Sequence, residues 1–190
     1  MGTTVFLDAN VLFSASLGGE SFDLLWELAE TAKVRFVTSV YCHTEARENL
    51  QRKRSTRLGK LVERMRSVEL TGSGDEHLEW ARSLLPEKDA PVLAAAAAAG
   101  ASVLITGDRT HFGHLMDRAD LPVRVMTVRS FLLRGPGEQA PRAGPGPKAA
   151  TSSGSPPGSA PLPAASDPGS EDPGQAPAPG AEAGRASRHP

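Results

Sequence analysis

Residues 3–13 read TTVFLDANVLF, and this stretch decides the fold. Thr3 to Leu7 is β-branched and apolar with no polar alternation, which indicates a strand that is covered on both faces. Asp8 follows the strand directly, and Asn10 can cap a helix that starts at Val11. The stretch therefore predicts a buried strand that passes into a helix through a carboxylate and an amide.

The alternation of strands and helices continues along the chain. We expect further strands at 34–38, 68–70, 102–106 and 123–126, and helices that begin at Ser21 and Ser39 or cover 56–66, 75–85, 89–99, part of 108–117 and 128–133. Strands that alternate with helices predict an α/β fold of three layers, with helices on both faces of a central, mainly parallel sheet. In such sheets ligands bind beyond the carboxyl ends of the strands.

Composition divides the chain near Arg134. Residues 135–190 hold thirteen of the sixteen prolines and ten of the nineteen glycines, and Leu162 is their one large apolar residue. Such a segment cannot bury enough surface to offset an ordering entropy of roughly 1–2 kcal/mol per residue. We therefore predict one folded domain over 1–134 and a disordered tail rich in Pro, Gly, Ala and Ser over 135–190; a linker or partner-binding role for the tail is the alternative.

The predicted domain carries balanced charge, with seventeen basic and seventeen acidic residues. Any affinity for nucleic acid must then come from local clusters of charge. The single cysteine, Cys42, excludes an internal disulfide and is expected to be a small core residue. No segment reaches the ~18 apolar residues that a membrane span requires, so a cytoplasmic protein is the simplest interpretation.

Three aspartates stand at positions where side chains can converge. Asp8 and Asp108 follow predicted strands, and Asp89 precedes a predicted helix whose first turn holds Pro91. Each aspartate also has a plain structural interpretation, because aspartate caps helices and is common in turns.

Glu45 is the fourth carboxylate. On a helix it shares the side of Cys42 and Ala46, where an unpaired carboxylate would be costly to bury, although a nearby arginine could also neutralise it. Four converging carboxylates would repel one another unless a divalent cation neutralised them. Oxygen ligands suit Mg²⁺ or Mn²⁺, ions that assist the hydrolysis of phosphate esters.

The motifs FLDANVLFSA at 6–15, SVYCHTEARENL at 39–50, EKDAPVLAAAAAAG at 87–100 and VLITGDRTHF at 103–112 together resemble the PIN-domain nucleases. This family includes the VapC-type toxins of bacterial toxin–antitoxin pairs. The resemblance covers about residues 3–133 in order and spacing. It implies a PIN-like fold and an Mg²⁺- or Mn²⁺-dependent endoribonuclease whose acidic site is Asp8, Glu45, Asp89 and Asp108.

The same resemblance implies supporting roles for Asn10 and Thr106, which would hydrogen-bond the acidic residues without binding the metal; for Asn10, helix capping is compatible with this role. It also implies an RNA substrate, an antitoxin partner if the chain is a toxin, and a homodimer. The long tail and the basic helices between Glu45 and Asp89 depart from the shortest toxins. Both features bear on the toxin assignment and not on the nuclease assignment.

Basic residues gather between Arg47 and Arg66, where eight stand against two acidic residues. We predict that RNA binds there through Arg52, Lys53, Arg54, Arg57 and Lys60; a solvated helical face is the alternative. His111 and His114 follow Asp108 and are interpreted as surface residues rather than ligands. Two functions remain open: a metal-dependent endoribonuclease, or an RNA-binding or regulatory protein of the same fold without nuclease activity.

Overall fold

The computed structural model describes residues 2–31, 34–116 and 118–135. The strands are β1 (Thr3–Leu7), β2 (Val34–Ser39), β3 (Val68–Thr71), β4 (Val103–Ile105) and β5 (Arg124–Met126). The helices are α1 (Ala9–Leu17), α2 (Glu20–Thr31), α3 (Val40–Lys53), α4 (Leu58–Met65), α5 (Leu78–Arg82), α6 (Ala90–Ala98), α7 (Arg109–Phe112) and α8 (Val128–Arg134). Short 3₁₀ turns cover Ser55–Arg57, Asp75–His77 and Gly113–Leu115.

The strands form one sheet in the order β3-β2-β1-β4-β5, and all the described pairs are parallel. The central strands β1 and β4 pair Leu7 with Ile105, so their carboxyl ends lie at the same edge. Val5, Phe6 and Leu7 are buried, which agrees with a strand covered on both faces. The parallel register places the residues that follow β1, β2, β4 and β5 side by side.

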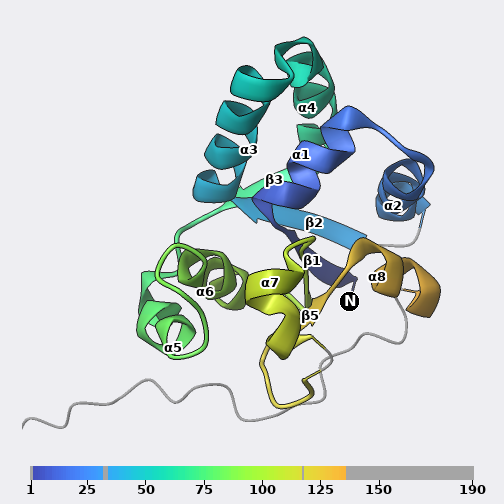
Figure 1. Ribbon diagram of the computed structural model, residues 1–190. Coiled ribbons are helices and arrows are strands. Elements are labelled where there is room, and N and C mark those ends of the chain that lie inside the picture. Colours follow the sequence, from blue (N-terminus) through green and yellow to red (C-terminus); the bar gives the residue numbers. More distant parts are fainter. Residues whose placement is uncertain (1, 32–33, 117, 136–190) are drawn as a thin grey trace, which may run out of the picture. The chain divides into compact units, whose positions relative to one another are not determined.

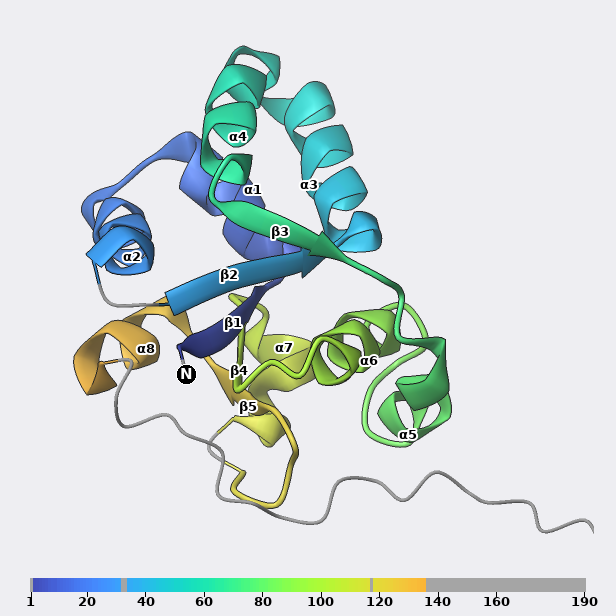
Figure 2. The same ribbon diagram turned by 180° about the vertical axis from the view of Figure 1, so that it is seen from behind.

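Helices cover both faces of the sheet (Figure 1). One layer contains α1, α2, α3 and α4, and the opposite layer contains α5, α6 and α7, as the view from behind also shows (Figure 2). The alanine-rich α6 packs against β2 and β4, because small side chains allow close approach to the sheet. The predicted three-layer α/β/α fold is confirmed.

Two local predictions are wrong. The first helix begins at Ala9 and is capped by Asp8, whose side chain accepts a hydrogen bond from the Ala9 N–H, so Asn10 lies inside the helix. The second helix begins at Glu20, and Ser21 lies within its first turn. Gly18 and Gly19 take positive φ angles between these helices, and the Phe22 and Asp23 N–H groups bond to the Gly19 carbonyl. This turn fixes where the second helix begins.

Ser39 and Thr127 cap α3 and α8, since their side chains accept bonds from the N–H groups of Cys42 and Ser130. Cys42 is fully buried, as expected for a core residue. The predicted tail, apart from Gly135, lies outside the described residues. None of the helices among the described residues is long and apolar enough to cross a membrane.

Candidate active site

Asp8 is buried at the carboxyl end of β1, with a side chain that is 4% exposed. One carboxylate oxygen accepts a hydrogen bond from the Ala9 N–H at 2.6 Å. The other accepts bonds from Thr106 Oγ1 at 2.6 Å and Asn10 Nδ2 at 2.5 Å. These donors fix the position and orientation of the carboxylate.

Asn10 and Thr106 connect Asp8 to the loop that follows β4. Asn10 Oδ1 accepts a 2.7 Å bond from the Gly107 N–H, and Thr106 Oγ1 accepts a 3.0 Å bond from the Asp108 N–H. Because the two residues bond both strand ends, they hold Asp8 and Asp108 in a fixed relation. This arrangement is consistent with the supporting role predicted for them.

Asp108 caps α7, and its Oδ1 accepts bonds from the N–H groups of Thr110 and His111. Its Oδ2 lies 2.7 Å from His111 Nδ1. The capping interpretation of Asp108 is therefore correct, and it is compatible with a role in a site because Asp108 also lines a pocket with Asp8 and Asp89.

Asp89 stands at the start of α6 but makes no capping bond with its side chain. Its Oδ2 is buried and has no hydrogen-bond partner among the described residues. This oxygen lies 3.5 Å from His111 Nδ1 and 4.0 Å from Lys88 Nζ. An unsatisfied buried carboxylate oxygen is costly, so capping does not account for Asp89.

Glu45 was expected on the inward side of its helix with Cys42 and Ala46. Those two residues are buried, whereas Glu45 is exposed. Glu45 lies in the first half of α3, and water solvates its exposed carboxylate. The argument that Glu45 needs a cation because it is buried is therefore wrong, although the residue does line the pocket with Asp8.

His111 is a site residue that the sequence interpretation missed. Its Nδ1 and carboxylate oxygens of Asp89 and Asp108 all lie within 4.8 Å of one another. The sequence signal was its spacing, because a residue three positions after a helix cap can fold back onto the capping carboxylate. His114 instead bonds the Leu84 carbonyl and is exposed, as predicted.

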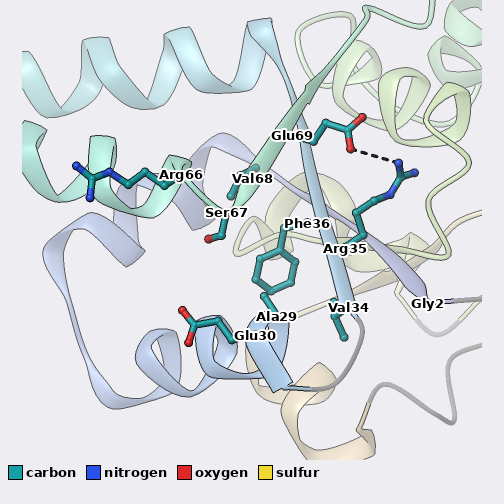
Figure 3. A pocket seen from close by; sticks show the side chains of 10 residues that line it. All are labelled: Gly2, Ala29, Glu30, Val34, Arg35, Phe36, Arg66, Ser67, Val68 and Glu69. Carbon is teal, nitrogen blue, oxygen red and sulfur yellow. Dashed lines mark hydrogen bonds and ion pairs between the residues drawn. The ribbon is translucent and has the colours of Figure 1, made fainter.

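The four predicted carboxylates line one pocket of about 280 Å³, together with Ala9, Asn10, Tyr41, Lys88, Val92 and Gly107. A larger hollow of about 620 Å³ lies around the amino-terminal halves of β2 and β3, away from these carboxylates (Figure 3). There Arg35 already pairs with Glu69. None of the four predicted carboxylates lines this larger hollow.

Burial raises the pKa of Asp8 from its ordinary value of 3.8 to about 6. Its hydrogen bonds with Thr106, Ala9 and Asn10 oppose this change, and the charge of Glu45 adds to it. For Asp108, burial alone would also raise the pKa, but its bonds with His111 and Thr110 hold it below the ordinary value. The pocket thus contains carboxyl groups with different proton affinities.

The donor set suits a hard divalent cation. Oxygen atoms of Asp8, Asp89 and Asp108 come from three separate segments of the chain. The Asp89 Oδ2 makes no hydrogen bond among the described residues, and a bound cation would satisfy it. Carboxylate oxygens are the ligands that Mg²⁺ and Mn²⁺ prefer, and one imidazole is compatible with Mn²⁺.

The basic residues predicted to bind RNA lie at the far end of α3 and on the turn and helix that follow. Arg52, Lys53, Arg54 and Arg57 are exposed. Arg52 bonds Asn49, and Lys60 pairs with Glu63 at 2.9 Å. The structure therefore places these cations on one protruding region, and Lys60 is already partly neutralised.

The PIN-domain family model matches residues 4–110, which is more than half of the chain. The chain belongs to the PIN-domain family, a family of nucleases. No curated protein matches the chain.

Solved structures agree on the fold. VapBC2 from Rickettsia felis, bound to a DNA fragment from its promoter, has a TM-score of 0.52 at 15% identity over 66% of this chain and 98% of that chain. DNA-bound VapBC from Salmonella typhimurium has a TM-score of 0.52 at 14% identity over 66% and 98%. VapBC-1 from nontypeable Haemophilus influenzae has a TM-score of 0.50 at 16% identity over 67% and 99%.

Proposed function

We propose that this protein is a divalent-metal-dependent endoribonuclease. The observation that carries the proposal is the convergence of Asp8, Glu45, Asp89 and Asp108 from different elements into one pocket. Membership of the PIN-domain family supports the nuclease class. The reaction would be hydrolysis of an RNA phosphodiester, in which a water oxygen bonds to phosphorus and one P–O ester bond breaks.

Asp8, Asp89, Asp108 and Glu45 would hold Mg²⁺ or Mn²⁺, with His111 beside them. Such an ion lowers the pKa of water and neutralises charge on the phosphate. Thr106 and Asn10 keep the Asp8 oxygens in place, and the backbone N–H groups of α7 orient Asp108. Preorganised ligands of this kind need little rearrangement when the substrate arrives.

We also propose that the exposed cations Arg52, Lys53, Arg54 and Arg57, together with the half-buried Lys60, contact the RNA backbone. Exposed lysine and arginine side chains bind phosphates with little dependence on sequence, so this contact should weaken with salt.

The VapBC structures that share the fold are toxin–antitoxin complexes, which supports a toxin role here with an antitoxin as partner. A homodimer and a cytoplasmic location belong to the same proposal. A search for a short reading frame beside the gene tests the toxin role separately from the nuclease activity.

The nuclease proposal is tested by incubating the protein with total RNA in Mn²⁺ and comparing wild type with Asp89→Asn. Asp89→Asn is the sharpest variant because the Asp89 Oδ2 makes no hydrogen bond among the described residues, so the amide breaks no hydrogen bond at this atom and removes the charge that lies near His111 and Lys88. We expect a loss of cleavage of about a hundredfold or more. Asp8→Asn should also lose activity, but the NH₂ group of the new asparagine would face groups that now donate hydrogen bonds to the Asp8 carboxylate.

Glu69→Gln is the matched control, because Glu69 lies on the edge strand β3, where it pairs with Arg35 and lines a different hollow (Figure 3). It should cleave as the wild type does. Undiminished cleavage by Asp89→Asn would refute the proposed site. RNA binding by a wild type that cleaves nothing in Mn²⁺ would favour the RNA-binding or regulatory alternative, which the exposed cations of α3 also support.

A further inference from the structure

A second hollow lies at the carboxyl edge of the sheet. It has a volume of about 480 Å³ and is lined by residues of α7, the turn after it and the start of α8: Arg109, Gly113, Met116, Thr127, Arg129 and Ser130. We call it the arginine pocket. None of the predicted site residues lines it.

We call the pocket lined by the four predicted carboxylates the acidic pocket. Consecutive residues of the chain line the acidic pocket and the arginine pocket. Asp108 lines the acidic pocket and Arg109, the next residue, lines the arginine pocket. The Thr106 N–H bonds the Met126 carbonyl at 3.0 Å, which joins the loops after β4 and β5. The segments that follow β1 and β4 therefore carry Asp8 and Asp108, and the segments that follow β4 and β5 carry Arg109 and Arg129.

The two guanidinium groups have no carboxylate partner among the described residues. Arg35, Arg82 and Arg118, by contrast, each pair with one or more carboxylates. Both Arg109 and Arg129 stand in the first turn of a helix, where the backbone N–H groups disfavour a cation. Neither helix stability nor a neighbouring acid accounts for these arginines.

Hydroxyl groups complete the lining. Thr127 accepts a bond from the Ser130 N–H, and its hydroxyl donates to Ser130 Oγ at 3.0 Å. Since Ser130 Oγ accepts this bond, its own proton has no acceptor among the described residues. The described lining therefore offers two cations and a hydroxyl donor, and none of the described lining residues is acidic.

We propose that the arginine pocket binds a backbone phosphate of the RNA strand whose scissile phosphate lies in the acidic pocket. The proposal rests on the proposed nuclease function and adds a separate subsite to it. Guanidinium groups bind phosphate oxygens through paired N–H donors, and hydroxyl groups add a further bond. Contacts of this kind position a strand without reading its sequence.

The test measures binding of a random-sequence single-stranded RNA of about 20 nucleotides in EDTA, as a function of salt. We expect Arg109→Gln and Arg129→Gln each to weaken binding on the order of tenfold at low salt. The slope of log affinity against log salt should fall by about 0.7 for each lost phosphate contact.

Arg35→Gln is the matched control, since it removes one exposed arginine at the opposite edge (Figure 3). It should leave the salt slope unchanged. Equal losses in Arg35→Gln, or unchanged slopes in both pocket variants, would overturn the subsite. Thermal unfolding of each variant separates a loss of contact from a loss of fold, and Arg129→Lys should restore the slope.

The two proposals fail separately. In Mn²⁺, the pocket variants should raise KM for long RNA and leave kcat nearly unchanged, because they bind a phosphate away from the reacting one. A wild type that does not cleave would refute the nuclease function, yet the EDTA measurement would still decide whether the arginine pocket binds RNA.

Discussion

At the scale of single residues, Asp8 shows how burial and hydrogen bonding compete. The fold surrounds its carboxylate with donors from Thr106, Asn10 and Ala9, yet burial still raises the pKa to about 6. The ionised form is therefore held at a cost that a divalent cation would offset. This balance makes the proposed site sensitive to pH.

We predict that Mn²⁺ stabilises the protein much more at about pH 7.5 than at about pH 5. The folded pKa of Asp8 is raised, so the contribution of Asp8 to stability is largest below about pH 4 and falls as pH rises to about 6. The difference between 3.8 and about 6 corresponds to about 3 kcal/mol, which bound Mn²⁺ would recover only where Asp8 is ionised.

The measurement is the difference in Tm between Mn²⁺ and EDTA at the two pH values. Glu69→Gln should show the same pH dependence as wild type, and Asp8→Asn should lose it. An equal gain in Tm at both pH values would contradict the assignment of Asp8.

At the scale of elements, the packing of α6 depends on a close backbone approach at the middle of the helix. Gly74 has a φ of +73°, and a Cβ atom there would lie 2.5 Å from the Ala94 carbonyl oxygen. The turn before α5 can therefore pack on α6 only with glycine at this position. Because α6 begins directly after Asp89, the packing of α6 also affects the position of the Asp89 side chain in the pocket.

We predict that Gly74→Ala destabilises the protein by roughly 3 kcal/mol, since it combines left-handed strain with a backbone clash. Gly100→Ala is the control. Gly100 also has a positive φ, of +61°, but nothing lies within 4 Å of an added Cβ. It should cost only about 1 kcal/mol. Urea unfolding of the two variants measures the difference, and equal losses would show that the contact with Ala94 has no effect.

At the scale of the whole molecule, composition separates a domain from the segment that follows it. The described residues of the domain share one buried core of strands and helices. The disordered tail over 135–190 remains a prediction, because residues 136–190 lie outside the described part of the chain.

We predict that a chain that ends at Gly135 unfolds at the same Tm as the full chain and retains any cleavage of RNA. The reason is that residues 136–190 contain a single large apolar side chain, Leu162, and so have little surface with which to stabilise the core. Differential scanning calorimetry of the two chains measures this. A fall in Tm of several degrees would show that the tail packs on the domain.

The sequence by itself determined the order of strands and helices and the positions of the acidic residues along the chain. Apolar runs such as Thr3–Leu7 predict parallel strands, and parallel strands bring the residues at their carboxyl ends to one edge. For that reason Asp8 and Asp108 could be predicted to lie near each other. The sequence did not determine where the first helix begins, because Asp8 and Asn10 are both good caps.

Only the tertiary structure decided which of these side chains are free to bind a ligand. Capping is a local bond that any of the three aspartates could make, and the fold uses Asp8 and Asp108 in this way, while the Asp89 Oδ2 makes no hydrogen bond among the described residues. His111 lies beside Asp89 as well as Asp108, and Arg109 lines a different hollow with Arg129. The spacing along the chain could bring His111 to Asp108, but its approach to Asp89 and the pairing of Arg109 with Arg129 depend on how distant elements pack.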